Sequence, residues 1–445
     1  MNTKTYQERR TLLRKNTEQG NIILLSSNFV PRNYAANTYP FHQESSFLYY
    51  TGLMCSGAAL WIDEHGAETL FYEPEDPDDV IWTGPRPSPE DLAAQSGIAR
   101  CLPITELKGH IRSSKRVHFL PPFDFQHKVQ LQSLLELPVG ELCSHASTSL
   151  VRAVIAQRSV KSAEEIAELE EAIGVTKLML KNAQSVIAPG KLETEIAAAL
   201  VLPAQARNRQ QSFAPIVTIH GETLHNEPQS RPVAAGDILL IDCGCESPLG
   251  YCADITRSYP VSGKFSSKQQ AIYDIVLEAQ RRAIEESAKP QASQRDLHFA
   301  ASTAITEGLK SVGLMKGNVS DAVQNGAHAL FMPHGIGHML GIDVHDMENL
   351  GDEVGYEIGE KRSTQFGLNA LRLAKELRPG FVFTVEPGIY FIPELIRRWE
   401  ADQHLAEFIC YDKLAEYLDF GGIRIEDDVV KTETGSRVLG PGIEK

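Results

Sequence analysis

The sequence predicts an α/β domain followed by an α+β domain, and three observations support this fold class. The chain has 445 residues, more than a single hydrophobic core usually holds. Short apolar segments typical of strands dominate residues 21–153, whereas a capped helix begins near residue 162. Alternating helices and short strands follow it. We therefore predict two domains, residues 1–157 and 158–445.

The first domain is expected to begin with a helix and to contain a sheet. Residues 1–14 are charged throughout and lack the apolar run of a signal peptide. Buried strands are predicted where short apolar segments occur, at residues 22–25, 58–62, 69–72 and 117–120. The second and third of these strands are joined by a turn that contains Gly66, which predicts a hairpin.

The second domain is expected to alternate helices with strands. Ser162 and Glu165 form a capping box at the start of its first helix, and Pro189 and Gly190 stop that helix. Another long helix is predicted at residues 267–287, and residues 366–377 are also interpreted as helical. The predicted strands are residues 215–219, 238–242, 254–259, 382–386 and 422–427.

Composition restricts the possible partners and the location. The net charge of −15 disfavours a nucleic-acid groove, and the longest apolar runs are far shorter than the about 20 residues of a membrane span. We therefore expect neither nucleic acid nor a membrane as a partner. Seven scattered cysteines do not form a disulfide framework, which predicts a cytoplasmic protein. Cys243 and Cys245 are expected to be buried, unreactive thiols.

Two aspartates lie on predicted neighbouring strands. Asp242 ends a fully apolar strand, and a carboxylate buried there needs a metal ion or an arginine as its counter-charge. Asp254 belongs to the next strand, so antiparallel pairing would bring the two carboxylates together. Either aspartate alone would be an ordinary residue of a strand end.

Residues 331–346 contain three histidines, His334, His338 and His345, placed among glycines. Isolated histidines are usually core or surface residues. Three histidines in a glycine-rich segment, where the backbone can approach other groups closely, indicate a functional site instead.

Two glutamates, Glu386 and Glu426, lie in or at the end of predicted apolar strands. Glu426 could pair with Arg424, since residues i and i+2 share a strand face. It could also bind a metal, because an arginine often orients a metal-binding carboxylate, and both roles can hold together. Four carboxylates and a histidine suit Mn²⁺, Fe²⁺, Co²⁺ or Zn²⁺. So many ligands favour two ions that share carboxylates and activate a water molecule.

These five segments, in this order, resemble the aminopeptidase P and prolidase branch of the pita-bread metallopeptidases, peptidase family M24. The resemblance extends to residues 39–52 of the first domain and so covers nearly the whole chain. It implies an aminopeptidase-P-like N-terminal domain and a pita-bread catalytic domain. It also implies hydrolysis of the bond between an N-terminal residue and proline in peptide substrates, and we expect a homo-oligomer.

The resemblance also implies a role for each site residue. Two ions, usually Mn²⁺, would be held, with Asp254 and Glu426 bridging both and Glu386 also transferring a proton. Histidines would contact the substrate and stabilise the tetrahedral intermediate. Eleven residues separate Asp242 from Asp254, one more than is usual in the family, and the turn between them should absorb the extra residue. The implied metal ligands are Asp242, Asp254, His338, Glu386 and Glu426, and the implied catalytic residues are His225, His334, His345 and Glu386.

Within this branch, aminopeptidase P trims longer peptides, whereas prolidase accepts dipeptides. The first domain and residues 271–284 look more like aminopeptidase P, which we favour, whereas residues 346–420 resemble an insertion of prolidases. Arg372 matches an arginine with which prolidases bind the proline carboxylate, and a solvated helix arginine is the alternative. A further alternative is an inactive pita-bread binding protein, although such proteins lose the ligands that this chain retains.

Overall fold

The computed structural model describes residues 1–73 and 78–445, which divide into two compact units. The first unit comprises Met1–Arg158 together with Asn349–Gly351. The second comprises Ser159–Glu348 and Asp352–Lys445. Each unit has its own hydrophobic cluster.

The first unit contains a five-stranded mixed sheet in the order β6-β5-β4-β1-β7. Three predicted strands are confirmed, and the fourth ends earlier than expected, before the prolines at 121 and 122, which cannot donate ladder hydrogen bonds. A separate small hairpin pairs β2 with β3. The strands are β1 (Asn21–Leu25), β2 (Pro31–Tyr34), β3 (Asn37–Thr38), β4 (Ala59–Ile62), β5 (Glu68–Tyr72), β6 (Cys101–Pro103) and β7 (Val117–His118).

Helices cover this sheet. The predicted N-terminal helix is confirmed as α1, and side chains of α5, α6 and α7 pack against the face that carries Ile23 and Trp61. Helix α2 contacts α1 as well as β1 and β4. The helices are α1 (Thr3–Asn16), α2 (Ser45–Thr51), α3 (Asp79–Thr83), α4 (Pro89–Ser96), α5 (Leu107–Arg112), α6 (Phe125–Leu135), α7 (Leu142–His145) and α8 (Thr148–Ser159).

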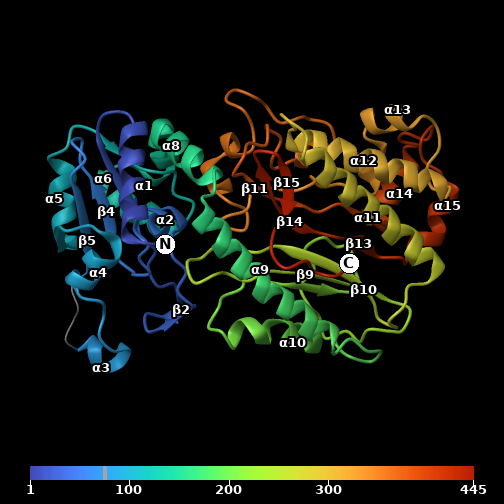
Figure 1. Cartoon of the computed structure of the whole chain (residues 1–445), viewed down its shortest axis with the longest axis horizontal. Helices are drawn as coiled ribbons and strands as arrows, with labels where there is room; N and C mark the ends of the chain where they lie inside the picture. Colours follow the sequence, from blue (N-terminus) through green and yellow to red (C-terminus); the bar gives the residue numbers. More distant parts are fainter. Residues whose placement is uncertain (74–77) are drawn as a thin grey trace. The chain divides into compact units, whose positions relative to one another are not determined.

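The second unit places strands between two pairs of long helices (Figure 1). Side chains of α9 and α10 pack on the sheet β10-β9-β8, and α11 contacts strands of the two other sheets, β11-β14-β15 and β12-β13. Its strands are β8 (Ile216–Thr218), β9 (Ile238–Cys243), β10 (Ile255–Pro260), β11 (Val382–Val385), β12 (Gly388–Tyr390), β13 (Gly422–Arg424), β14 (Asp427–Thr432) and β15 (Gly435–Val438).

The helices of this unit begin where the sequence indicates. The capping box of Ser162 and Glu165 is present at the start of α9, and the second long helix has the predicted bounds. Within the described part of the chain, no helix has both the length and the apolar character to span a membrane. The helices are α9 (Ala163–Gln184), α10 (Glu193–Gln205), α11 (Ser267–Ser287), α12 (Gln294–Ser311), α13 (Val319–Gln324), α14 (Pro393–Ala401) and α15 (Tyr411–Leu414).

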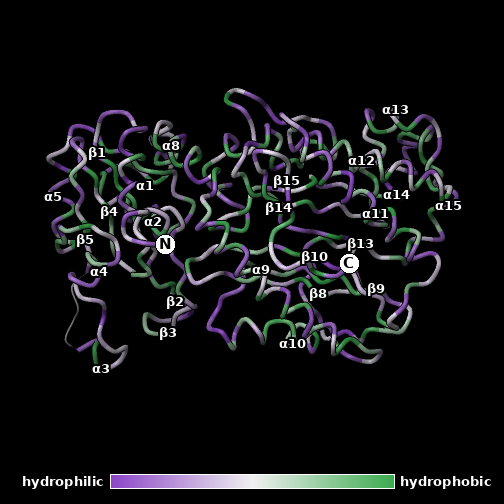
Figure 2. The backbone as a smooth tube through the Cα atoms, in the orientation of Figure 1, coloured by the Kyte–Doolittle hydropathy of each residue, from purple (hydrophilic) through white to green (hydrophobic). Residues whose placement is uncertain are grey.

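Burial follows the hydropathy of the sequence. Figure 2 shows hydrophobic and hydrophilic stretches alternating along the chain, as expected when one face of each element is buried. Cys243 and Cys245 are fully buried, which confirms the expectation for these thiols. Burial raises the pKa of Cys245 to about 11 and that of Cys243 well above its ordinary value, so both stay protonated and unreactive.

Two predicted elements are wrong. The strand predicted at residues 422–427 is divided into β13 and β14, which belong to different sheets. Between them the amide of Glu426 donates to the carbonyl of Thr256 (3.1 Å), which takes this residue out of the β14 ladder. The helix predicted at residues 366–377 is a single 3-10 turn, Leu368–Ala370, because the carbonyl of Leu371 accepts hydrogen bonds from the side chains of Tyr356 and Arg362 instead.

Candidate metal centre

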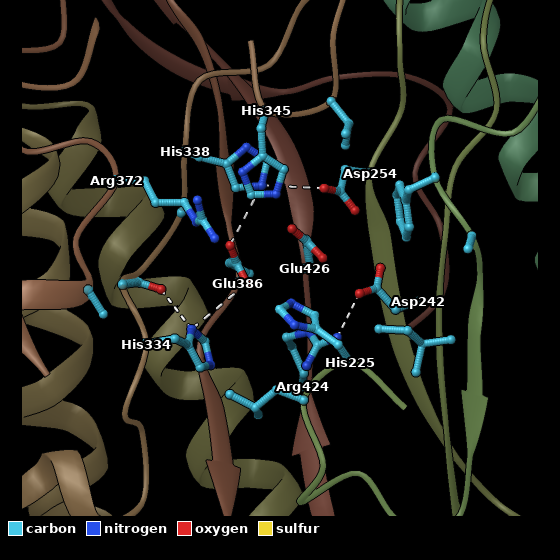
Figure 3. A pocket seen from close by; sticks show the side chains of 18 of the residues that line it. His225, Asp242, Asp254, His334, His338, His345, Arg372, Glu386, Arg424 and Glu426 are labelled. Atoms are coloured by element: carbon cyan, nitrogen blue, oxygen red, sulfur yellow. Dashed lines mark hydrogen bonds and ion pairs between the residues drawn. The ribbon is translucent and has the colours of Figure 1, made fainter. Parts of the chain in front are cut away.

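A cavity of about 420 Å³ in the second unit is lined by every residue that the sequence places in the site (Figure 3). These residues come from distant parts of the chain and lie in or beside all three sheets of this unit. Apolar side chains, among them Phe213, Leu224 and Val344, complete the wall. The predicted site residues on this wall are His225, Asp242, Asp254, His334, His338, His345, Arg372, Glu386, Arg424 and Glu426.

The β9–β10 hairpin positions the two aspartates. Asp242 pairs with Thr256 across the ladder, and the same register continues to the bridge between Glu246 and Cys252. The turn beyond that bridge can therefore hold the additional residue without displacing the aspartates. The hairpin is unusually tight here, because a Cβ at Gly244 would lie 1.7 Å from the carbonyl oxygen of Ala253.

The two glutamates flank a second ladder. Val385 of β11 pairs with Asp427 of β14, and Glu386 and Glu426 are the next residues of each strand toward the cavity. The hydroxyl of Thr256 donates to Oε2 of Glu426 (2.7 Å) and orients this carboxylate. The two strands therefore place both carboxylates on the wall of the same cavity.

His338 is held beside this ladder by backbone contacts. Its amide donates to Oγ1 of Thr384 (3.2 Å), and a Cβ at Gly337 would lie 2.0 Å from the carbonyl oxygen of Thr384. Nδ1 lies 3.0 Å from the carbonyl of Met339, to which it donates. This contact leaves the lone pair of Nε2 free to bind a cation.

The arrangement of charges fits a divalent cation. Ligand atoms of Asp254, His338 and Glu426 lie within 4.8 Å of one another, and Nε2 of His338 is 3.8 Å from Oε1 of Glu386. Burial and neighbouring carboxylates raise the pKa values of Asp254 and Glu426 well above the usual range. Among the described residues, the buried Oδ1 of Asp242 has no hydrogen-bond partner. Positive charge at this point would compensate all of these groups.

Arg424 contacts Asp242, which corrects the predicted alternative of a pair with Glu426. Its Nη2 donates to Oδ2 of Asp242 (2.6 Å), and its Nε donates to Oγ1 of Thr256 (3.1 Å). In an unbroken strand, Arg424 and Glu426 would share a face. The strand is interrupted between them, so they do not.

His334 and Tyr390 form a hydrogen-bonded pair at the other side of the cavity. Nδ1 of His334 donates to the carbonyl of Gly335 (2.8 Å), and Nε2 lies 2.9 Å from the hydroxyl of Tyr390. Burial lowers the pKa of His334 and raises that of Tyr390 to about 12. Both groups are therefore neutral at pH 7, and Nδ1 of His334 lies 3.9 Å from Oε2 of Glu386.

His345 stacks on His338, with ring centroids 3.9 Å apart and planes inclined by 13°. Its Nδ1 lies 3.0 Å from Oε1 of Glu348, and Oε2 of Glu348 accepts from Nη1 of Arg372 (2.6 Å). Burial would raise the pKa of Glu348, but the hydrogen bond and charge of His345 and the charge of Arg372 lower it to about 2. Arg372 is 46% exposed and lies on the cavity wall, outside any helix.

Sequence reasoning did not assign four residues of this site. Thr256 and Asp428 lie two residues from Asp254 and Glu426, respectively, so strand periodicity could have indicated them. Oδ2 of Asp428 accepts from the amide of Asp254 (3.1 Å). Tyr390 and Glu348 carry no comparable signal, because only the folded chain brings them to the site.

The whole chain is similar to known proteins. Residues 167–433 match the model of metallopeptidase family M24, and residues 6–118 match that of the aminopeptidase P N-terminal domain. A Pyrenophora teres f. teres (strain 0-1) protein named Probable Xaa-Pro aminopeptidase pepP is 31% identical over 411 residues, covering 90% of this chain and 85% of the relative. Human Xaa-Pro dipeptidase is 32% identical over 452 residues, covering 96% of this chain and 88% of the relative.

Solved structures match over the full length. The structure of proline aminopeptidase P II from Yersinia pestis superimposes with a TM-score of 0.82 at 30% identity, and the match covers 100% of this chain and 97% of that chain. Both the N-terminal and the C-terminal parts therefore have counterparts in one solved protein.

Proposed function

The chain belongs to metallopeptidase family M24, and from this premise we propose that it is an Xaa-Pro aminopeptidase with a dinuclear metal site. It would remove the first residue from peptides that carry proline in the second position. The observation that carries the proposal is the convergence of four carboxylates and His338 in one cavity, beside three further histidines. The matches also confirm the predicted fold class, an aminopeptidase-P-like domain followed by an M24 domain.

The proposed ligands of two divalent ions are Asp242, Asp254, His338, Glu386 and Glu426. Carboxylate oxygens outnumber the single imidazole, which favours Mn²⁺, and Co²⁺, Zn²⁺ and Fe²⁺ also suit these donors. When bound, such ions would lower the pKa of a coordinated water molecule and polarise the peptide carbonyl. Residues 158–445 form the proposed catalytic domain and residues 1–157 the N-terminal domain.

The residues around the ions have separate proposed tasks. Glu386 would transfer a proton to the proline nitrogen, which must leave as a secondary amine. His225, His334 and His345 would contact the substrate and stabilise negative charge on the carbonyl oxygen. The apolar wall would accommodate the proline ring and restrict the access of water.

The test of this proposal uses two substrates. The manganese-loaded protein is incubated with an Xaa-Pro dipeptide and with an Xaa-Pro-Xaa tripeptide, and the products are separated by chromatography. We expect release of the first residue from the tripeptide. Turnover of the dipeptide alone would identify an Xaa-Pro dipeptidase, the alternative that Arg372 favours. Absence of turnover with both peptides would favour an inactive binding protein.

We also propose a cytoplasmic location and a homo-oligomeric state. The seven cysteines, all within the described residues, form no disulfide, which is typical of a reducing compartment and supports the first proposal. Light scattering of the purified protein would test the second. The net charge of −15 disfavours nucleic acid and anionic membranes, which carry the same sign of charge. It is compatible with small peptides as the partners.

A further inference from the structure

Glu348 contacts two residues of the cavity wall, His345 and Arg372, that are proposed to bind the substrate. One carboxylate oxygen lies 3.0 Å from Nδ1 of His345, and the other accepts from Nη1 of Arg372 at 2.6 Å. In the described part of the chain, Glu348 is the acceptor that the guanidinium of Arg372 contacts. Arg372 therefore reaches the cavity already paired with an anion (Figure 3 shows Arg372 and His345).

The loop that carries Glu348 is held firmly. Asp346 forms an ion pair with Lys161 (2.9 Å), and both side chains are 1% exposed. The amide of Asp346 donates to the carbonyl of Met339 (3.0 Å). Met347 is fully buried and has a φ of 65°, in the left-handed region that side chains other than glycine rarely adopt. Such a conformation persists where the surrounding structure imposes it, and here it precedes Glu348 directly.

The two candidate substrate classes differ in charge beside the proline. In a dipeptide the proline ends in a carboxylate, whereas in a longer peptide the same carbon belongs to a neutral amide. Arg372 by itself would attract the carboxylate. The Glu348 carboxylate compensates that attraction and would repel a second carboxylate brought to the same guanidinium. An unfavourable contact with the wrong ligand is an established route to specificity.

We infer that Glu348 is a specificity-determining residue that disfavours substrates with a free carboxylate next to proline, by occupying Arg372. This inference rests on the proposed function and refines its substrate class. The preferred substrates are peptides that continue beyond proline, in agreement with an aminopeptidase. Arg372 then serves less as a carboxylate-binding group than as a partner of Glu348.

The test compares an Xaa-Pro dipeptide with its C-terminal amide, two ligands that differ only in that charge. Glu348→Gln keeps the size of the side chain and removes its charge. We expect kcat/KM for the dipeptide, relative to the amide, to rise about tenfold, which corresponds to about 1.4 kcal/mol. Calorimetric binding of the two ligands to metal-free protein should show the same shift, independently of turnover.

Matched variants distinguish this role from a general effect. Glu357→Gln removes the same charge from another glutamate–arginine pair, Glu357–Arg378 (3.7 Å), which does not line the cavity, and should leave the ratio unchanged. Adding Arg372→Ala to Glu348→Gln should abolish most of the gain, because the released guanidinium would be absent. Elemental analysis should show equal metal content in all variants.

If Glu348→Gln leaves kcat/KM for the dipeptide relative to the amide unchanged or lowers it, the inference is wrong. A glutamate that only orients Arg372 would help dipeptides to bind, so its loss would lower this ratio. If the variant fails to fold, the wild-type protein provides a second test. Salt screens the repulsion, so higher ionic strength should raise dipeptide hydrolysis relative to the amide, and the opposite trend would contradict the inference. If the wild-type protein cleaves neither ligand nor any tripeptide, the proposed function itself fails.

Discussion

Arg424 donates from Nη2 to Oδ2 of Asp242 across 2.6 Å, and the two side chains are only 6% and 12% exposed. The other oxygen of Asp242 has no hydrogen-bond partner among the described residues and is available to the proposed metal ion. Replacing Arg424 with lysine keeps the charge but loses the planar fork that also contacts Thr256 and Tyr390.

We therefore expect Arg424→Lys to lower metal affinity about 10–100-fold, the usual loss when a residue that orients a ligand is replaced. Titration of the metal-free protein with Mn²⁺ would measure the change. Unaltered affinity would show that the charge of Arg424 is sufficient and that its fork does not orient Asp242.

Asp254 and Glu426 are proposed to be shared by both ions, and their ligand atoms lie within 4.8 Å of each other and of His338. Asp254→Asn and Glu426→Gln should each lose both ions. Elemental analysis gives the number of ions per chain. Two ions per chain in either variant would contradict the bridging assignment. A chelator should abolish activity of the wild-type protein, and Mn²⁺ or Co²⁺ should restore it.

His338 differs in its proposed role from its neighbours His334 and His345. His338→Ala should lose metal affinity, because its Nε2, which lies 3.4 Å from Oδ2 of Asp254, is the proposed imidazole ligand. His334→Ala and His345→Ala should keep their ions but lose about 10²–10³-fold in kcat, the cost of removing one stabilising donor. Metal content and kcat measured on the same preparations would separate the two outcomes. The reverse pattern would show that the ligand has been misassigned.

Acid should destabilise the fold through a buried histidine pair, His298 and His328, outside the cavity lining. Both are 0% exposed, and among the described residues their ring nitrogens have no hydrogen-bond partners. Burial lowers the pKa of His328 to about 4 and that of His298 well below 6.5. Below pH 6.5 the unfolded chain binds protons that the folded chain excludes.

The contribution of His328 to the free energy of unfolding should therefore fall by about 3 kcal/mol as the pH decreases from about 6.5 to about 4. The buried carboxyls of Asp254 and Glu426, whose pKa values are raised, act in the opposite direction in metal-free protein. Denaturant unfolding of metal-free wild-type protein and of metal-free His328→Leu across this range would measure the contribution as the difference between the two profiles. His328→Leu should remove this acid-dependent loss of stability, whereas His404→Leu, a change at an exposed histidine of the same unit, should not. A profile that His328→Leu leaves unchanged would exclude this source of acid sensitivity.

Local signals explain how much of the fold could be predicted. Capping residues and apolar segments depend on neighbours in the chain, so they predicted α9, α11 and β9. Residues 366–377 were misassigned because a periodic pattern cannot reveal that the carbonyl of Leu371 bonds to Tyr356 and Arg362. The division between β13 and β14 escaped prediction for the same reason, since it depends on a contact with Thr256.

The sequence by itself determined the proposed metal ligands and substrate-contacting residues of the cavity, because metal ligands must be particular residue types and the order of their segments resembles one family. Only the tertiary structure decided how those residues are paired. Asp242 and Arg424 are 182 positions apart, and Glu348 and Arg372 are 24 apart. No local pattern specifies such pairs, since long-range packing places the charges and each buried charge then takes the nearest suitable partner.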